Sequence, residues 1–322
     1  MTSDTNKKIP WGKIAKIAGG ILTVVSIIFV IRYFIQMDID FSLLLNPQII
    51  LSIILSGATT SFALFLLACG WKTILGMFST QPIPTATVVE IYGQANLSKY
   101  VPGNFMHYAM RNILGKKYDL SQKHMLISSI LELMLVVLAG IVLVAAFAWN
   151  GLIATIRQTL AEGILKKEWI VLLVIAAVIV VIALLVYMKK KGYLSSLRRK
   201  SIVATFSIYA ASLFVNSIAF FITLLFIDAQ AALQAPFTIC GFFLISWLVG
   251  TLVPGAPGGL GIREYVMLLL LAQFFSETDI ALVLIVSRLG SVLGDVLMYL
   301  VALLLKKNTA NKEKLLGDIK VL

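Results

Sequence analysis

Long apolar segments dominate this chain and constrain its fold more than any other feature. A helix needs about 20 apolar residues to cross a bilayer, and the sequence offers six regular stretches near that length. They are Ile14–Ile35, Gln48–Gly70, Met125–Trp149, Trp169–Met188, Ile202–Ile227 and Ala235–Val253. Two less regular stretches follow, Ile262–Phe275 and Asp279–Leu305. The pattern predicts an all-α, polytopic membrane helix bundle of about eight helices.

The composition supports a single integral membrane domain over residues 1–322. Hydrophobic residues make up 60% of the chain and charged residues 13%, about half the charged fraction of a soluble domain. We expect an N-terminal tail (1–13), a membrane bundle (14–305) and a C-terminal tail (306–322). The polar stretches are too short for a soluble catalytic domain of about 100 residues, so we expect no enzyme activity from such a domain.

The basic residues predict the orientation in the membrane. The net charge is +12, and its clusters lie beside apolar spans, as in cytoplasmic loops. Lysines before residue 14, the basic run 189–200 and Lys306–Lys307 place both termini in the cytoplasm, although basic residues in the predicted outer loop Asn150–Glu168 weaken this assignment. Anionic lipid head groups suit these clusters better than nucleic acid, for which no binding signature is present.

A short motif occurs twice among the apolar segments. Val101-Pro102-Gly103 is followed by Arg111, and Val253-Pro254-Gly255 is followed by Arg263, each arginine nine positions after the proline. Proline and glycine break helices, and broken helices are tolerated in a bilayer mainly where they line a cavity or a site. The copies are expected to be paired elements of one site. The alternative is that they are unrelated loop turns.

Both copies predict interrupted helices. The segment 82–123 starts and ends on the cytoplasmic face, so it is expected to form a re-entrant hairpin or two half-helices joined at Pro102-Gly103; an interfacial amphipathic helix is the alternative. After the second copy, the helix from Ile262 would point free N–H groups into the break, a geometry that binds anions. The candidate head-group ligands in the two breaks are Pro102, Gly103, Pro254, Gly255, Gly258 and Gly259.

Three arginines are candidates for binding a phosphate, because the guanidinium fork makes paired hydrogen bonds and keeps its charge when buried. They are Arg111, Arg263 and Arg288. As alternatives, Arg111 and Arg263 could snorkel to the cytoplasmic interface, and Arg288 could form a structural ion pair with Glu132 or Asp295.

Three acidic residues lie in or beside predicted membrane segments and are candidates for holding the arginines or coupling to protons. They are Glu132, Glu264 and Asp295. Glu264 could instead be only a helix N-terminal charge. Arg288 and Asp295 are seven apart, on nearly one face of their helix, and Gly290-x-x-x-Gly294 on that sector permits close helix approach. No nucleotide-binding loop, hydrolase motif or metal-ligand spacing is present, so we expect no cofactor, no metal and no assigned catalytic residue.

The motif blocks resemble those of a known family. The run from Leu97 to Gly103 followed by Arg111, and the run from Pro254 to Glu264, are similar to two blocks of the lysylphosphatidylglycerol synthase transmembrane-region family, and Arg288 also matches. The resemblance implies a bundle of about eight helices, similar to the flippase half of bifunctional synthases and without their soluble aminoacyl-transferase domain. It further implies a bacterial or archaeal cytoplasmic membrane and a role in envelope biogenesis.

The sequence therefore favours a lipid translocator that moves an anionic phospholipid or a polyprenyl-phosphate-linked sugar. A separate lipid-modifying or polysaccharide-synthesis enzyme, or a second copy of the chain, would be its protein partner. One alternative is a membrane glycosyltransferase or other lipid-modifying enzyme with Asp38, Asp40 or the Pro-Gly loops as its site. Another is a non-transporting partner of an envelope enzyme.

Overall fold

The computed structural model describes residues 45–79, 82–100, 105–149, 198–252 and 261–319, with isolated positions at 151, 153, 189, 190, 192 and 259. For 307–319 it describes only the backbone. The described part is helical and contains no strand. Four helices in it are long and apolar enough to cross a membrane, which agrees with the predicted all-α membrane protein. The predicted spans Ile14–Ile35 and Trp169–Met188 lie outside the described residues.

Nine α-helices and two short 3-10 turns, η1 and η2, make up the described chain. In order they are α3 (Pro47–Phe78), α4 (Thr85–Asn96), η1 (Leu97–Tyr100), α5 (Met106–Gly115), η2 (Lys116–Tyr118), α6 (Gln122–Phe147), α9 (Arg199–Ile227), α10 (Ala229–Gln234), α11 (Pro236–Leu252), α12 (Ile262–Leu271) and α13 (Glu277–Ile319).

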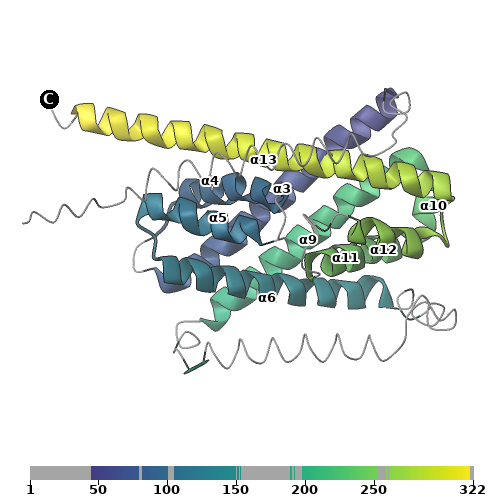
Figure 1. Ribbon diagram of the computed structural model, residues 1–322, viewed down its shortest axis with the longest axis horizontal. Helices are drawn as coiled ribbons and strands as arrows, with labels where there is room; N and C mark the ends of the chain where they lie inside the picture. Colours follow the sequence, from purple (N-terminus) through teal and green to yellow (C-terminus); the bar gives the residue numbers. More distant parts are fainter. Residues whose placement is uncertain are drawn as a thin grey trace, which may run out of the picture.

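Helix α13 runs along one side of the bundle and contacts α3 and α4, while α6 runs along the opposite side and contacts α9 and α11 (Figure 1). Between them, α3 and α9 cross and make the most extensive contact in the described fold. The short helices form two groups. Helices α4 and α5 lie toward the C-terminal end of α13, and α11 and α12 lie toward its N-terminal part.

Small residues let α13 approach α3 closely. A Cβ added at Gly290 would meet the Ser56 side chain, and one added at Gly294 would meet Thr60 and the Gly57 carbonyl. The predicted role of the Gly290-x-x-x-Gly294 sector in close helix packing is therefore confirmed, with α3 as the partner.

The observed helix bounds differ from the predicted spans mainly at one end. Helix α3 continues eight residues beyond the predicted end at Gly70, and α13 continues through Ile319, so the predicted C-terminal tail begins as an extension of the last helix. Helix α11 is a 17-residue apolar helix, shorter than the other spans. The stretch predicted from Ile262 forms only the 10-residue helix α12.

Two short helices lie on either side of the first motif copy. Helix α4 and turn η1 come before residues 101–104, and α5 follows them. Every residue of α4 from Val88 to Gly93 is buried, because α3 and α13 pack against it. An amphipathic surface helix would keep a solvated face, so this burial argues against the interfacial alternative for α4, whereas α5 is buried only at Met110, Arg111, Leu114 and Gly115. Entry of the pair into a bilayer stays a prediction.

Candidate functional site

Two adjoining cavities lie at the centre of the described bundle. Their common wall consists of Thr60, Asn216, Arg263, Arg288 and Ser291. The larger cavity extends toward α4, α5 and α6 and has a volume of about 130 Å³. One water needs about 10–15 Å³ on this measure, so the space suffices for a hydrated phosphate group.

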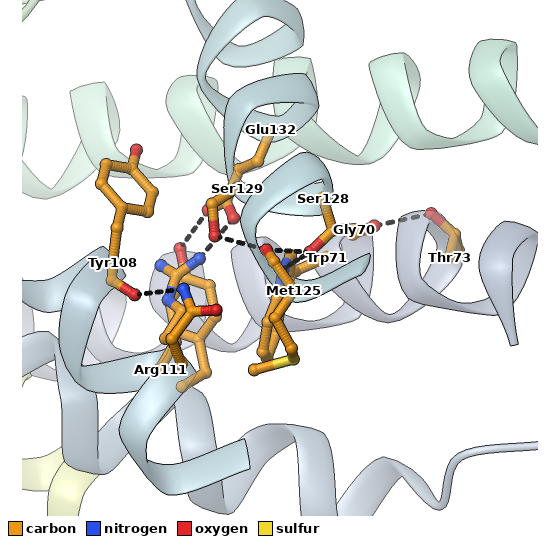
Figure 2. A network of polar contacts seen from close by, with 11 residues as sticks. Gly70, Trp71, Thr73, Tyr108, Arg111, Met125, Ser128, Ser129 and Glu132 are labelled. Carbon is orange, nitrogen blue, oxygen red and sulfur yellow. Dashed lines mark hydrogen bonds and ion pairs between the residues drawn. The ribbon is translucent and has the colours of Figure 1, made fainter. Parts of the chain in front are cut away.

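At one end of the larger cavity, Arg111 of α5 forms an ion pair with Glu132 of α6. Figure 2 shows the two side chains facing each other between these helices. The side chains are 1% and 4% exposed, respectively. Tyr92 donates a second hydrogen bond to Glu132 at 2.9 Å, and its ring centroid lies 3.8 Å from the Arg111 guanidinium carbon.

Aromatic rings enclose the rest of the Arg111 guanidinium. The Trp71 and Tyr108 ring centroids lie 5.0 and 5.1 Å from it, within the range of cation–π attraction. The Trp71 indole is itself held by a 2.9 Å hydrogen bond from its Nε1 to Ser128 (Figure 2). These contacts hold Arg111 in the wall of the cavity, and Glu132 neutralises its charge. The buried Nε of Arg111 has no hydrogen-bond partner among the described residues, so the feature that sets Arg263 apart is the missing carboxylate.

A second neutralised group joins turn η1 to α13. The Asp295 carboxylate is fully buried and accepts hydrogen bonds from Asn96, from Lys99 and from the Tyr100 hydroxyl. The Asn96 and Lys99 bonds are each 2.7 Å long. Burial lowers the pKa of Lys99, and Asp295 opposes that shift. Lys99 also lines the larger cavity.

The third pair joins α12 to α13. One oxygen of Glu264 accepts a hydrogen bond from Arg288 Nε, and the other accepts the Gly261 backbone N–H at 2.7 Å. Gly261 has φ 81°, a conformation that favours glycine, and it is the N-cap of α12. Glu264 therefore acts both as the predicted helix N-terminal charge and as the partner of Arg288.

Arg263 differs from Lys99, Arg111 and Arg288 because no described carboxylate lies within ion-pair distance of it. Its terminal nitrogen Nη2 reaches Thr251 Oγ1 at 3.3 Å, and its buried Nε has no hydrogen-bond partner among the described residues. Gly259, with φ 76°, lies so close that an added Cβ would meet Arg263 Nε. The neighbouring Arg288 guanidinium lines the same wall and repels Arg263, and a bound anion would offset this repulsion.

The cavity walls therefore carry more positive than negative charge. Four described cations, Lys99, Arg111, Arg263 and Arg288, line the cavities, against the three carboxylates paired above. The chain segments 101–104 and 253–258, which adjoin these walls in sequence, contain no acidic residue. A single negative group bound at Arg263 would balance the described charges.

The structure brings together the three predicted arginines, and residues beside both motif copies line one cavity. Of the predicted ligands in the breaks, Gly259 is described and lies against Arg263; Pro102, Gly103, Pro254, Gly255 and Gly258 lie outside the described residues, as do Asp38 and Asp40. Two alternatives were wrong. Arg288 pairs with Glu264 instead of Glu132 or Asp295, and Arg111 is enclosed instead of reaching an interface.

Sequence reasoning assigned no role to Lys99, Tyr100 and Tyr92, which donate hydrogen bonds to Asp295 and Glu132. Lys99 and Tyr100 lie three and two residues before Pro102, and Tyr92 lies in the same apolar segment. A lysine inside an apolar stretch is the same signal that singled out the arginines, so Lys99 could have been included. Tyr92 carries no such signal, because tyrosine is common in apolar helices.

Comparisons of this chain with protein-family models, with curated proteins and with solved structures found no match. The functional argument therefore depends on the sequence and on the geometry of the cavities.

Proposed function

We propose that this protein is a membrane lipid translocator that passes the phosphate of an anionic lipid through the central cavities while the acyl chains stay in the bilayer. The observation that carries the proposal is the state of Arg263. It lines both cavities, lacks a described carboxylate partner, and has a buried Nε without a hydrogen bond. Charged groups in membrane interiors are rare and mark substrate or ion pathways.

The surroundings of Arg263 support a lipid phosphate as the ligand. Arginine presents several donors in a planar fork, which matches phosphate oxygens. Arg288 lines the same wall and is held by Glu264, so it adds a positioned second guanidinium. The predicted resemblance to the flippase-like transmembrane region agrees with this reading, as do the four candidate membrane-spanning helices.

Charge pairing elsewhere in the cavities supports transit over permanent binding. If every cation were unpaired, an anion would be held strongly by four charges. With three of them neutralised, the excess is one charge among the described groups, and the ligand is attracted into the cavity without being trapped there. In this proposal Glu132, Glu264 and Asp295 hold their cations in place and weaken the attraction between the cavities and the bound anion.

The test is lipid movement in proteoliposomes. The purified full chain is reconstituted with phosphatidylglycerol carrying a fluorescent acyl chain, and a membrane-impermeant reductant bleaches the label that reaches the outer leaflet. We expect the labelled lipid to change leaflet faster than in protein-free vesicles. The measurement is made both with and without a proton gradient. Arg263→Gln should slow movement about 10- to 100-fold, since a hydrogen bond to a charged group contributes about 1.5–3 kcal/mol.

Arg198→Gln is the matched control. Arg198 is exposed just before α9, so its loss removes one positive charge from the protein without changing the cavity. Arg263→Lys should retain part of the rate because the charge remains while the fork is lost. Equal rates for Arg263→Gln and the unaltered protein, or no acceleration for any anionic lipid, would refute the proposal.

A further inference from the structure

A line of polar side chains follows the contact between α3 and α9, the most extensive contact in the described fold. Its members on α9 are three or four positions apart and therefore share one face of the helix; they are Thr205, Tyr209, Ser212 and Asn216. The hydroxyl oxygen of Thr205 contacts that of Thr73 on α3. The Tyr209 ring packs on Gly70, and Ser212 donates a hydrogen bond to the Ala63 carbonyl at 2.7 Å.

The line continues on α3 beyond the central cavities. Asn216 and Thr60 both belong to the wall that the two cavities share. From Thr60 toward the start of α3, Ser56 and Ser52 follow at intervals of one helical turn. Ser52, Ser56 and Thr60 are 0%, 2% and 9% exposed. The two helices thus present one buried polar line that passes along both cavities.

The line is as long as a bilayer is thick. From Ser52 to Thr73, α3 rises about 32 Å along its axis, and the hydrocarbon core of a bilayer is about 30 Å thick. Both ends reach exposed residues: Gln48 lies one turn before Ser52 on α3, and Lys200 lies little more than one turn before Thr205 on α9.

Two hydroxyls in the line, one on each side of the cavities, are buried without a hydrogen-bond partner among the described residues. They are Tyr209 Oη and Ser52 Oγ, and both residues are 0% exposed. Internal water is the usual partner of such groups, because an unpaired buried hydroxyl is unfavourable. Members of the line on one helix are about 4.5–6 Å apart along its axis, a length that one water spans with two hydrogen bonds of about 2.8 Å.

Water held in a line of this kind conducts protons, but positive charge opposes their entry. Each water accepts a proton on a lone pair and passes one of its own hydrogens to the next oxygen, so one O–H bond forms as another breaks. Cationic side chains exclude protons from water-filled pores. The charged residues that line the cavities are Lys99, Arg111, Glu132, Arg263, Glu264 and Arg288. The other titratable groups in the lining are Tyr92, His107 and Tyr108.

We propose that this polar line is a proton path across the membrane and that protons pass along it only while an anion is bound beside Arg263. With Asp295 paired to Lys99, the described groups carry one positive charge in excess, and the anion removes it. Repulsion of the proton then ceases, so a proton crosses together with the anionic lipid. This inference rests on the proposed function, because the lipid phosphate supplies the anion.

The test is proton entry into proteoliposomes that contain the full chain and a trapped pH-sensitive dye. A potassium gradient with valinomycin drives protons inward, and the vesicles consist of phosphatidylcholine either with or without phosphatidylglycerol. We expect protons to enter faster than in protein-free vesicles when phosphatidylglycerol is present, and no faster when phosphatidylcholine is the only lipid. Faster entry in both kinds of vesicle, or in neither, would overturn the proposal.

Two variants on different helices test the path itself. Tyr209→Phe and Ser52→Ala each remove one hydroxyl that lacks a described partner, and each should slow proton entry about tenfold, the equivalent of one hydrogen bond to water. Ser217→Ala is the matched control, because Ser217 of α9 donates to the Phe214 carbonyl at 2.7 Å and lines neither cavity. It should keep the full rate. Equal rates for the control and for either folded variant would show that protons do not use this line.

Lipid movement in the same vesicles separates this inference from the proposed function. Labelled phosphatidylglycerol that changes leaflet without any proton entry would overturn the proton path and leave translocation standing. Proton entry that requires phosphatidylglycerol, without any lipid movement, would support the path and refute translocation.

Discussion

Replacing Glu132 with glutamine leaves the Arg111 guanidinium buried and charged without a carboxylate partner. The side chains of the pair are 1% and 4% exposed, so water hydrates an unpaired charge at this end of the cavity poorly. Removing one partner of a buried pair lowers stability by about 3–5 kcal/mol. Arginine cannot lose its proton in a protein, and therefore Glu132→Gln should show this full effect at every pH at which the protein is folded.

The opposite substitution has a limited penalty. In Arg111→Gln, the unpaired Glu132 can take up a proton, and neutralising a glutamate with an ordinary pKa near 4.3 requires about 1.4 kcal/mol per pH unit above that value. The penalty is therefore at most about 3.7 kcal/mol at pH 7 and about 1.6 kcal/mol at pH 5.5. Stability of this variant should thus recover as the pH falls, because protonation relieves the folded state, while Glu132→Gln should not recover.

The assay is thermal unfolding of the detergent-purified protein at pH 7 and pH 5.5, followed by size-exclusion chromatography of the soluble fraction. With about 2 °C per kcal/mol for a large domain, Glu132→Gln should lower the midpoint by about 6–10 °C at both pH values. The double variant Arg111→Gln/Glu132→Gln should lose less than the sum of the single changes. A cycle in which the two single changes simply add would refute the buried pair.

A second ion pair provides the control. Lys306 lies 3.6 Å from Glu90, and its side chain is 49% exposed. The Glu90 side chain is only 8% exposed, but it also accepts a hydrogen bond from Gln94 at 3.1 Å, and the Lys306 end of the pair is solvated. Lys306→Gln should therefore lower the midpoint by less than Glu132→Gln. A larger shift from this control than from Glu132→Gln would contradict the ranking by burial.

Two further predictions follow from the same packing. Gly290→Ala should lower the free energy of unfolding by about 1–3 kcal/mol, because the added Cβ overpacks against Ser56. Gly76→Ala on α3, where an added Cβ meets nothing within 4 Å, should be neutral or stabilise by up to about 1 kcal/mol. Equal unfolding midpoints for the two variants would contradict the close approach of α13 to α3. Tyr100→Phe removes a hydrogen bond to the buried Asp295 and should lower stability by about 1.5–3 kcal/mol. Its control, Tyr265→Phe at a 57% exposed position, should change the unfolding midpoint by less than about 1 °C. A larger loss from Tyr265→Phe than from Tyr100→Phe would rule out the Asp295 contact.

The sequence predicted most of the described spans because apolar length is a local property. Helices α6 and α9 begin within three residues of the predicted starts at Met125 and Ile202. The extension of α13 to Ile319 was missed, because hydropathy stops at Leu305 whereas helix propensity does not. The spacing of Arg288 and Asp295 correctly predicted a polar face on this helix.

The pairing of charges could not be predicted, because it depends on contacts between helices far apart in the chain. Glu132 and Arg288 were both candidates for one ion pair, yet Arg111 and Glu264 take these places. The choice is decided by packing: α5 contacts α6, and α12 contacts α13. Hydropathy and spacing along a single helix contain no information on these neighbours.

The two charged residues on α13 connect the regions around the two motif copies. Asp295 binds Lys99, three residues before Pro102, and Arg288 binds Glu264, ten residues after Pro254. A single helix thus holds one element beside each copy, with a carboxylate for the first and a guanidinium for the second. Because α13 is one continuous helix, the contact of Asp295 with η1 and the contact of Arg288 with α12 are both made by a single element.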